Sequence, residues 1–299
     1  MKAIALLNAS AGSRAASIDL ANLIEAAFQA AGIDAVIRSI DGPSLRTEAE
    51  AAAKSAVDVV IVAGGDGTVS TVAGALAGTE KVLGVLPTGT LNHFAKDLGI
   101  PLELSEAAAV IAVGNVGAID VGEVNGRIFI NNSSLGLYPE MVRDRDAARR
   151  SRGLSKWPAA VIAMLQVAWR FPTMKVRITT DHGTIDRKTP LAFLGNNRYE
   201  LDLLNVGRRL SLADGELSLY VTRATTRLGL VWLTIKALLG RINTMNDLEE
   251  FALTECRIAT HHRHVQVAVD GEVQRMVPPL NYSIRPRSLR VCVPGTPPG

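Results

Sequence analysis

Continuous apolar runs alternate with helix-periodic segments along the first 98 residues of the chain. The apolar runs predict strands at residues 2–7, 35–40, 57–62 and 83–86. Apolar positions at helical spacing predict helices at residues 19–31, 47–56, 69–77 and 91–98. Strands that are apolar throughout and alternate with helices are typical of a parallel sheet covered on both faces. We therefore expect a doubly wound, mostly parallel sheet.

After about residue 115 the pattern changes to short strands separated by turn dipeptides. The turn signals are Asn125-Gly126, His182-Gly183, Asp214-Gly215 and Asp270-Gly271. The strands predicted between them are residues 116–124, 127–131, 175–180, 216–223 and 265–269. Two predicted helices, 158–170 and 227–239, interrupt this segment. The second half therefore reads as a β-rich, antiparallel, sandwich-like domain.

The fold class predicted is α/β with two domains, which a chain of 299 residues is long enough to form. Residues 1–120 are expected to form the α/β domain and residues 121–285 the β-rich domain. A C-terminal strand at about residues 286–299 is expected to return to the first domain.

The amino-acid composition excludes several classes of protein. The chain is 47% hydrophobic and 20% charged, which excludes a disordered protein. Its two cysteines make neither a disulfide framework nor a zinc site, so a reducing, cytoplasmic compartment is expected. The longest apolar stretches, 157–169 and 228–239, fall short of the ~20 residues that span a bilayer. A net charge of +3 gives no argument for nucleic acid.

Glycine-rich bends carry the candidate chemistry. Gly64, Gly65, Asp66, Gly67 and Thr68 lie between a predicted strand and a predicted helix, where free backbone N–H groups attract an anion. Glycine brings no Cβ that would hold phosphate oxygens away. The carboxylate of Asp66 would repel a phosphate directly, so its presence suggests Mg²⁺ and phosphoryl transfer. The alternative is an ordinary tight turn between strand and helix.

Two further bends follow strands of the same predicted sheet. Thr88, Gly89 and Thr90 follow the fourth strand, and residues 8–12 follow the first. The carboxyl ends of parallel strands share one edge of a sheet, so these bends can converge on one ligand. We interpret this edge as a nucleotide site. Neither a Walker A loop, nor a dinucleotide fingerprint after the first strand, nor a protein-kinase motif is present.

At these residues the sequence resembles the catalytic domain of the diacylglycerol kinase family, related to sphingosine, ceramide and NAD kinases. The specific pieces are the Gly64–Thr68 motif and residues 86–101, LPTGTLNHFAKDLGIP. Residues 212–217 and 270–272 support it, and the resemblance covers nearly the whole chain. It implies an NAD-kinase-like first domain, and ATP as the phosphoryl donor. The residues implied to bind ATP are Asn8, Ala9, Ser10, Ala11, Gly12, Ser39, Gly64, Gly65, Asp66, Gly67, Thr68, Val69, Ser70, Thr88, Gly89, Thr90 and Asn92.

The resemblance also implies the acidic residues of catalysis. Glu272 is implied to accept the proton of the lipid hydroxyl, with Asp270 in the same turn, while Mg²⁺ offsets phosphate charge. Read without the resemblance, this Asp-Gly-Glu segment is a hairpin turn with a solvated glutamate. Asp66 is the third acidic residue expected to take part in catalysis.

A structural Mg²⁺ is implied in the β-rich domain, held by the Asp214 carboxylate and the carbonyls of Ser211 and Glu216. Two positions depart from the family pattern. His93 stands where many relatives have an aspartate, which leaves the catalytic metal geometry open. Ala9 stands where relatives often have proline, which loosens the first loop without removing its donors.

Contact with an anionic membrane surface is expected from residues 143–156, where six basic side chains accompany two aspartates ahead of Trp157. Each basic side chain near an anionic leaflet contributes about 1 kcal/mol. A solvated basic loop before a core helix is the equal alternative. Residues 227–241 read as a core helix more readily than as a second docking helix. A metal site at His261, His262 and His264 is disfavoured, because no carboxylate or cysteine of suitable spacing accompanies them.

The sequence therefore predicts a peripheral, cytoplasmic lipid kinase that uses ATP and Mg²⁺ on a membrane lipid. Two alternatives stay open: a kinase for a soluble substrate such as NAD, and a nucleotide-gated lipid carrier that has lost turnover. The identity of the lipid and the oligomeric state, a homodimer included, are not fixed by the sequence.

Overall fold

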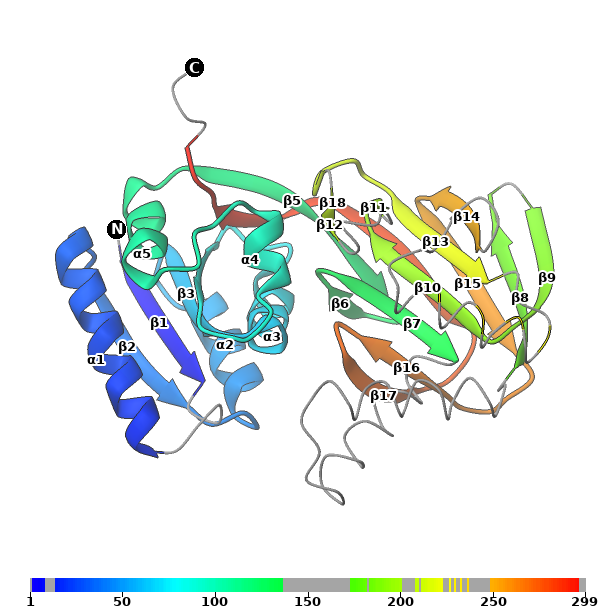
Figure 1. Cartoon of the computed structure of the whole chain (residues 1–299), viewed down its shortest axis with the longest axis horizontal. Coiled ribbons are helices and arrows are strands. Elements are labelled where there is room, and N and C mark those ends of the chain that lie inside the picture. The colour runs from blue at the N-terminus through cyan, green and yellow to red at the C-terminus, as the bar shows by residue number, and fades with distance from the viewer. Residues whose placement is uncertain are drawn as a thin grey trace. The chain divides into compact units, whose positions relative to one another are not determined.

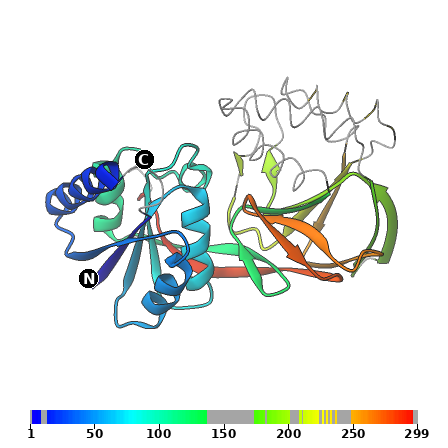
Figure 2. The same cartoon turned by 90° about the horizontal axis from the view of Figure 1, so that it is seen from below.

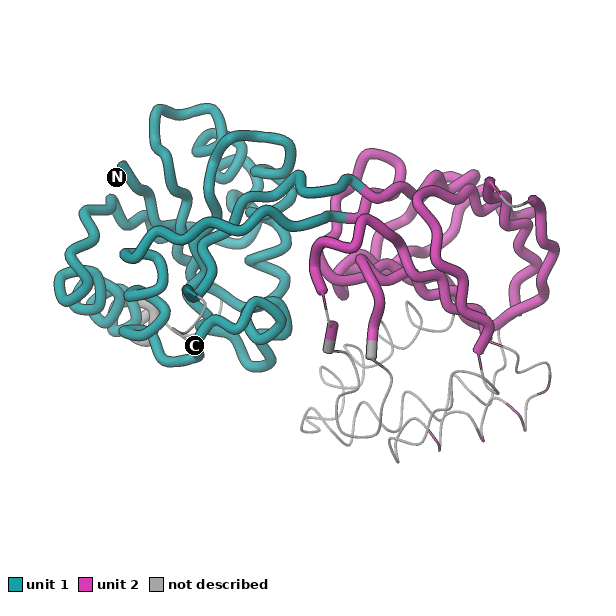
Figure 3. The backbone as a smooth tube through the Cα atoms, turned by 90° about the horizontal axis from the view of Figure 1, so that it is seen from above, with its two compact units in different colours: residues 1–121, 285–299 teal, residues 122–284 magenta. Residues whose placement is uncertain are grey.

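The computed structural model divides the chain into two compact units, residues 1–121 with 285–299 and residues 122–284 (Figure 3). It describes residues 2–8, 14–136, 173–181, 183–200, 208–209, 211–222, 226, 229, 232, 236 and 248–295. The chain leaves the first unit within strand β5 (Val116–Val124) and returns to it within β18 (Leu280–Cys292). The predicted loop 9–12, the basic run 143–156, the helix 158–170 and most of 227–241 lie outside the described residues.

The first unit is built on a parallel sheet with the strand order β2-β1-β3-β4. The strands are β1 (Ala3–Asn8), β2 (Ala35–Ile40), β3 (Val59–Gly64) and β4 (Val82–Pro87). The end of β18 adds to β4 in parallel through Arg290 and Val291. Every residue of β3 and β4 is buried, as expected for strands covered on both faces. The predicted parallel sheet is confirmed.

Helices cover both faces of this sheet (Figures 1 and 2). They are α1 (Arg14–Ala31), α2 (Leu45–Lys54), α3 (Asp66–Leu76), α4 (His93–Asp97) and α5 (Leu104–Val113). Helix α1 packs beside α5, and α2 packs beside α3. The sequence-based prediction omitted α5, which begins where Glu103 accepts hydrogen bonds from the N–H groups of Ser105 and Glu106.

The second unit is a sandwich of antiparallel strands. One layer contains β5, β6 (Arg127–Phe129), β8 (Met174–Thr180), β9 (Gly183–Thr189), β15 (Glu255–Thr260) and the beginning of β18. The other has the order β14-β13-β10-β7-β16-β17. Its strands are β7 (Asn132–Gly136), β10 (Leu191–Asn196), β13 (Leu217–Thr222), β14 (Leu248–Leu253), β16 (Val265–Val269) and β17 (Glu272–Met276). A short pair, β11 (Tyr199–Glu200) and β12 (Arg208–Arg209), lies apart from both layers' pairings.

Apolar side chains from both layers form one core. Ile178 and Ile258 come from the first layer, and Leu194, Leu219 and Val267 from the second; each is at most 1% exposed. Along β8 the burial alternates with a period of two, so that one face of this layer packs inward and the other meets solvent. The predicted antiparallel, sandwich-like domain is confirmed. None of the helices in the described part of the chain is long and apolar enough to cross a membrane.

Both cysteines are buried, Cys256 in β15 and Cys292 in β18. Burial raises the pKa of Cys256 to about 12, with a smaller contribution from the charge of Glu255, and raises the pKa of Cys292 to about 11. Because the thiolate is the reactive form, neither cysteine should react with a disulfide reagent at pH 8 while the protein is folded. Both should react at once in denaturant. A fast native reaction of either thiol would contradict this packing.

The same shifts predict a loss of stability at high pH. Thiols of the unfolded chain ionise near pH ~8.5, whereas the folded thiols stay protonated. Above that pH the native state therefore binds more protons than the unfolded state, and the free energy of unfolding falls up to about pH 11. Urea titrations at several pH values should show the fall. A variant with both cysteines replaced by alanine should show less of it.

Candidate functional site

The first glycine-rich bend joins β3 directly to α3. Gly64 ends the strand, Gly65 is the extended N-cap, and Asp66 begins the helix. The first intrahelical hydrogen bond runs from the N–H of Val69 to the carbonyl of Gly65, at 3.0 Å. The N–H groups of residues 66–68 therefore have no partner within the helix. Together with the helix dipole they can bind an anion at this end of the helix.

The second bend lies against the first. A Cβ placed on Gly89 would overlap the Cα of Gly65, and a Cβ on Gly65 would lie 3.3 Å from the Cα of Gly89. The N–H of Thr88 donates to the carbonyl of Gly64 at 3.2 Å. The two bends thus meet backbone to backbone, as expected from the shared sheet edge. Glycine is required at position 89, whereas a Cβ at position 65 would be a tight contact.

Asn92 braces the second bend from inside. It has a left-handed backbone, with φ of 51°, and is 7% exposed. Its side-chain oxygen accepts the N–H of Gly89 at 3.0 Å, and its Nδ2 donates to the carbonyls of Gly89 at 2.9 Å and Pro87 at 3.4 Å. The side-chain amide of Asn92 therefore forms its hydrogen bonds with the backbone of this bend. Two threonines on this bend are also predicted to bind ATP. Thr88 is half-buried, and Thr90 is exposed.

Asp66 connects the first bend to α4. Its Oδ1 accepts the N–H of Phe94 at 3.1 Å, which caps the beginning of that helix. Its other oxygen, Oδ2, has no hydrogen-bond or ion-pair partner among the described residues. His93, the residue before Phe94, is exposed at the first position of α4. The carboxylate can thus hold the helix and still offer one oxygen.

The remaining predicted residues of the first unit lie along the same edge. Asn8 ends β1, and its Nδ2 donates to Thr68 Oγ1 at 2.9 Å. Ser39 lies opposite Leu7 near the end of β2 and is exposed. Val69 is 3% exposed, so its side chain belongs to the core and only its backbone can face a ligand. Ser70 is half-buried. Ala9, Ser10, Ala11 and Gly12 lie outside the described residues.

In the second unit, Asp270 holds a turn that lies far from it in sequence. Its carboxylate accepts the N–H groups of Ile130 at 2.9 Å, Asn131 at 2.8 Å and Asn132 at 3.0 Å. The N–H of Asp270 donates to the carbonyl of Asn132 at 2.8 Å. Its backbone is left-handed, with φ of 47°. This residue therefore fixes the backbone around residues 130–132, in addition to any part in catalysis.

Arg209 binds the same turn through its carbonyl groups, and no sequence pattern indicated this role. Its side chain is buried, and its guanidinium donates to the carbonyl of Ile130 and to Asn131 Oδ1, the latter at 2.9 Å. Asn196 Nδ2 also donates to the carbonyl of Ile130, at 2.9 Å. The guanidinium carbon lies 5.6 Å from the ring centroid of Tyr199, a cation–π distance.

Glu272 begins β17, two residues after Asp270, and its side chain is 54% exposed. Its Oε2 accepts a hydrogen bond from Arg127 Nη2 at 3.0 Å. With its amide oxygen turned toward the guanidinium, Gln274 accepts from the same group at 2.7 Å. Oε1 of Glu272 has no hydrogen-bond or ion-pair partner among the described residues. Arg127, which no sequence pattern indicated, thus holds Oε2, while Oε1 can still accept a hydrogen bond.

The segment predicted to hold a structural Mg²⁺ forms a turn. Ser211 Oγ accepts the N–H of Ala213 at 3.2 Å, and the carbonyl of Glu216 accepts the N–H of Asn197 at 3.0 Å. Asp214 is exposed. A cluster of three or more His, Cys, Asp or Glu side chains suited to a metal does not occur in the described residues. A site here would therefore depend on main-chain carbonyls and water.

The fold and these bends define a class of protein: an α/β unit with glycine-rich bends at one sheet edge, joined in one chain to an antiparallel sandwich. Residues 2–124 match the family model of the diacylglycerol kinase catalytic domain. Residues 134–293 match that of the YegS C-terminal NAD kinase beta sandwich-like domain. The chain belongs to the diacylglycerol kinase family.

Individual relatives agree with this assignment. A diacylglycerol kinase of Mycobacterium tuberculosis is 31% identical over an alignment that covers 98% of this chain and 95% of that protein. One of Bacillus subtilis is 43% identical over 99 residues, which cover 32% of this chain and 33% of the relative. The crystal structure of a candidate diacylglycerol kinase from Bacillus anthracis has a TM-score of 0.76 at 26% identity and covers 98% of this chain and 95% of that one. These relatives support a lipid kinase-like function.

The backbone contact of the two bends predicts the effect of adding a methyl group. Gly89→Ala should destabilise the protein by about 1–3 kcal/mol, because its Cβ collides with the Gly65 backbone. Gly67→Ala is the matched control, since a Cβ there meets nothing within 4 Å. Its stability should be unchanged or slightly raised. Urea unfolding of both variants tests this, and equal stabilities would contradict the contact.

Asp270 offers a second test of stability. Asp270→Gly should lose about 1–3 kcal/mol, because glycine tolerates the left-handed backbone but leaves three part-buried N–H groups without their acceptor. Asp270→Asn keeps one acceptor oxygen and should lose less. Asp270→Ala adds backbone strain and should lose the most. Urea unfolding gives the order, and an Asp270→Gly variant as stable as the native protein would show that the turn does not need the carboxylate.

Proposed function

We propose that the protein is an ATP-dependent lipid kinase that transfers the γ-phosphoryl group to a hydroxyl of diacylglycerol or a related lipid. The observation that carries the proposal is the backbone contact between Gly65 and Gly89 at the carboxyl edge of the parallel sheet. It brings two bends that meet at glycines to the positive end of a helix, an arrangement that suits a chain of phosphates. Membership of the diacylglycerol kinase family supports a lipid as the acceptor.

The described residues fit ATP and Mg²⁺. The N–H groups of residues 66–68 would donate to phosphate oxygens, and the hydroxyls of Thr88 and Thr90 would add donors from the second bend. Ser39 lies on the neighbouring strand, where it suits a ribose hydroxyl. The open Oδ2 of Asp66 is the hard oxygen ligand that Mg²⁺ prefers. When bound, Mg²⁺ would neutralise charge on the phosphates.

Glu272 is proposed as the proton acceptor. The lipid oxygen forms a new bond to phosphorus, the bond from phosphorus to ADP breaks, and the hydroxyl proton passes to Glu272 Oε1. Arg127 holds Oε2 and so orients the carboxylate, which leaves Oε1 to accept the proton. Asp270 fixes the turn from which β17 starts, and so limits the positions that Glu272 can reach. Its role in this proposal is positioning.

The structural Mg²⁺ and the membrane contact extend the proposal. Asp214 and the carbonyls of Ser211 and Glu216 would hold the ion at the turn that precedes β13. Because the acceptor lipid lies in a membrane, we also propose a peripheral, cytoplasmic enzyme that reaches an anionic surface through the basic residues 143–156.

Glu272→Gln tests the proposed function. With labelled ATP, Mg²⁺ and mixed lipids, label transfer should fall by about 10²–10⁴-fold, because the amide cannot accept the proton. ATP binding should be unchanged. Glu255→Gln is the control, because Glu255 is an exposed glutamate at the start of β15 with no ion pair among the described residues.

The other outcomes separate the alternatives. Unchanged transfer by Glu272→Gln would remove this residue as the base. Label appearing in NAD and in no lipid would identify a soluble-substrate kinase. ATP binding without ADP release in the presence of every lipid would identify a carrier that has lost turnover.

A further inference from the structure

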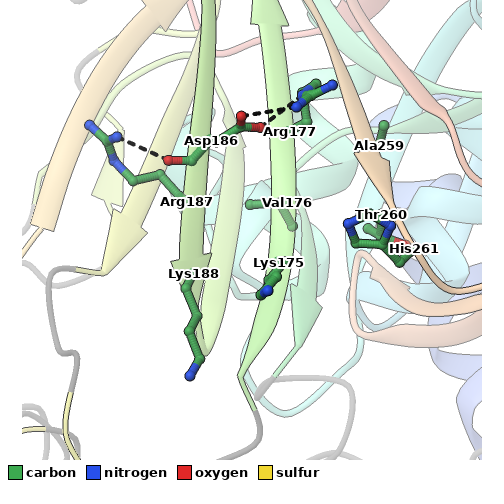
Figure 4. Close-up of a pocket in the computed structure, with 9 residues that line it drawn as sticks. All are labelled: Lys175, Val176, Arg177, Asp186, Arg187, Lys188, Ala259, Thr260 and His261. Carbon is green, nitrogen blue, oxygen red and sulfur yellow. Dashed lines mark hydrogen bonds and ion pairs between the residues drawn. The ribbon is translucent and has the colours of Figure 1, made fainter.

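A basic pocket lies on the layer of the second unit that contains β8, β9 and β15, and it plays no part in the site described above. It has a volume of about 440 Å³ and is lined by residues of β8, β9 and the end of β15 (Figure 4). The charged and polar lining side chains are Lys175, Arg177, Asp186, Arg187, Lys188, Thr260 and His261. The volume lies within the range of small-molecule sites, about 300–1,000 Å³.

Two lysines in this pocket face each other across neighbouring strands. Lys175 of β8 is the direct partner of Lys188 of β9 in the antiparallel register, so both side chains lie on the same face. Both are exposed, and neither forms a hydrogen bond or ion pair with any residue that the structure describes. Like charges directly opposite each other destabilise a sheet. An anion between the two ammonium groups would turn that repulsion into attraction.

The carboxylates near the lysines are already engaged. Asp186 forms a bidentate ion pair with Arg177, with N–O distances of 2.8 and 3.0 Å. Glu249 of β14 pairs with Arg187 at 3.1 Å. The hydrogen bonds from Arg177, and to a lesser degree the charges of Arg177 and His261, lower the pKa of Asp186. These two ion pairs neutralise the charges of Arg177 and Arg187, so the positive charges of the two lysines remain in excess.

The other polar lining residues of the pocket are Thr260 and His261. His261 is exposed directly after β15. Thr260 pairs with the buried Val176 in the register of β15 and β8, so its side chain lies on the face opposite Lys175, where its Oγ1 accepts the N–H of His262 at 3.2 Å. Figure 4 shows Lys175 and Lys188 on the same side of the Arg177–Asp186 pair. Two ammonium groups on one face suit an oxyanion with several acceptor oxygens.

We propose that this pocket binds a phosphate group, carried by a phospholipid headgroup or by a soluble phosphate, between Lys175 and Lys188. The proposal is independent of ATP and of Glu272, so its test needs no catalytic activity. Phosphate is favoured because its tetrahedral oxygens can accept from both lysines at once.

The test variant is Lys175→Gln with Lys188→Gln in the full chain. Without a ligand it should be at least as stable as the native protein, because the repulsion between the strands is gone. Lys175→Arg with Lys188→Arg keeps the charge and should retain binding. The matched control is Arg46→Gln with Lys54→Gln on α2, which makes the same change of charge at exposed positions.

Two arms distinguish the sources of the phosphate. In the first, inorganic phosphate is added at constant ionic strength, and the rise in Tm is measured. In the second, flotation is measured with vesicles of phosphatidylcholine alone and mixed with phosphatidylglycerol. For the glutamine variant we expect about 25-fold weaker vesicle binding, from about 1 kcal/mol per lysine, while the α2 control keeps native affinity.

Each outcome decides the proposal. If phosphate raises the Tm of the native protein but not that of the glutamine variant, a soluble ligand is supported. If the glutamine variant instead loses only its binding to the vesicles that contain phosphatidylglycerol, a lipid headgroup is supported. The proposal is overturned if the native protein and the glutamine variant respond equally in both arms. It is also overturned if the α2 control loses as much binding as the glutamine variant, because net charge would then explain the effect.

Discussion

The close approach of Gly65 and Gly89 is the constraint on which the sheet edge of the first unit depends. The parallel register of β3 and β4 places Gly64 opposite Pro87, so the two chains leave the sheet side by side and must bend within a few residues. A side chain at Gly89 would push the bends apart, and one at Gly65 would make their contact tight. Asn92 supplies the compensating hydrogen bonds, because no strand remains to pair with the backbone of the second bend. Its own left-handed conformation is tolerable because asparagine is among the residues that adopt it most readily.

A different principle organises the turn at residues 130–132 in the second unit. Asp270 binds the N–H groups of this turn, while Arg209 and Asn196 bind the carbonyl of Ile130. The peptide groups therefore lie between a negative and a positive side chain, and each charge polarises the backbone toward the other. A buried charge must find such partners, because its desolvation otherwise costs several kcal/mol. The same turn fixes the start of the hairpin that bears Glu272.

The sequence sufficed for the four parallel strands and helices α1 to α4 of the first unit and for the edge at which the bends meet, because these follow from local periodicity and from the geometry of parallel strands. It missed α5 and the strands β7, β9, β10, β14, β15 and β17, whose short segments carry no clear period of their own. The predicted ranges 116–124 and 265–269 coincide with β5 and β16. It could not supply contacts between distant residues. Asp270 is separated from its partners by about 140 positions, and Arg127 is 145 positions from Glu272. No pattern marks Arg209 either, since an arginine in a polar segment reads as solvated until its surroundings are known.

Under the proposed function, His93 would affect the chemistry less than the resemblance to a family with an aspartate at this position implies. Asp66 uses one oxygen to cap α4 and leaves the other open, so this bend can contribute a single carboxylate ligand. Mg²⁺ usually keeps several waters and takes one or two carboxylates together with phosphate oxygens, instead of an all-protein cage. One carboxylate oxygen would therefore suffice for an ion that arrives with the nucleotide in the proposed reaction. A cap that also orients this carboxylate would lower the entropy lost when such an ion binds, so the N–H of Phe94 would belong to the proposed site even though it touches no ligand.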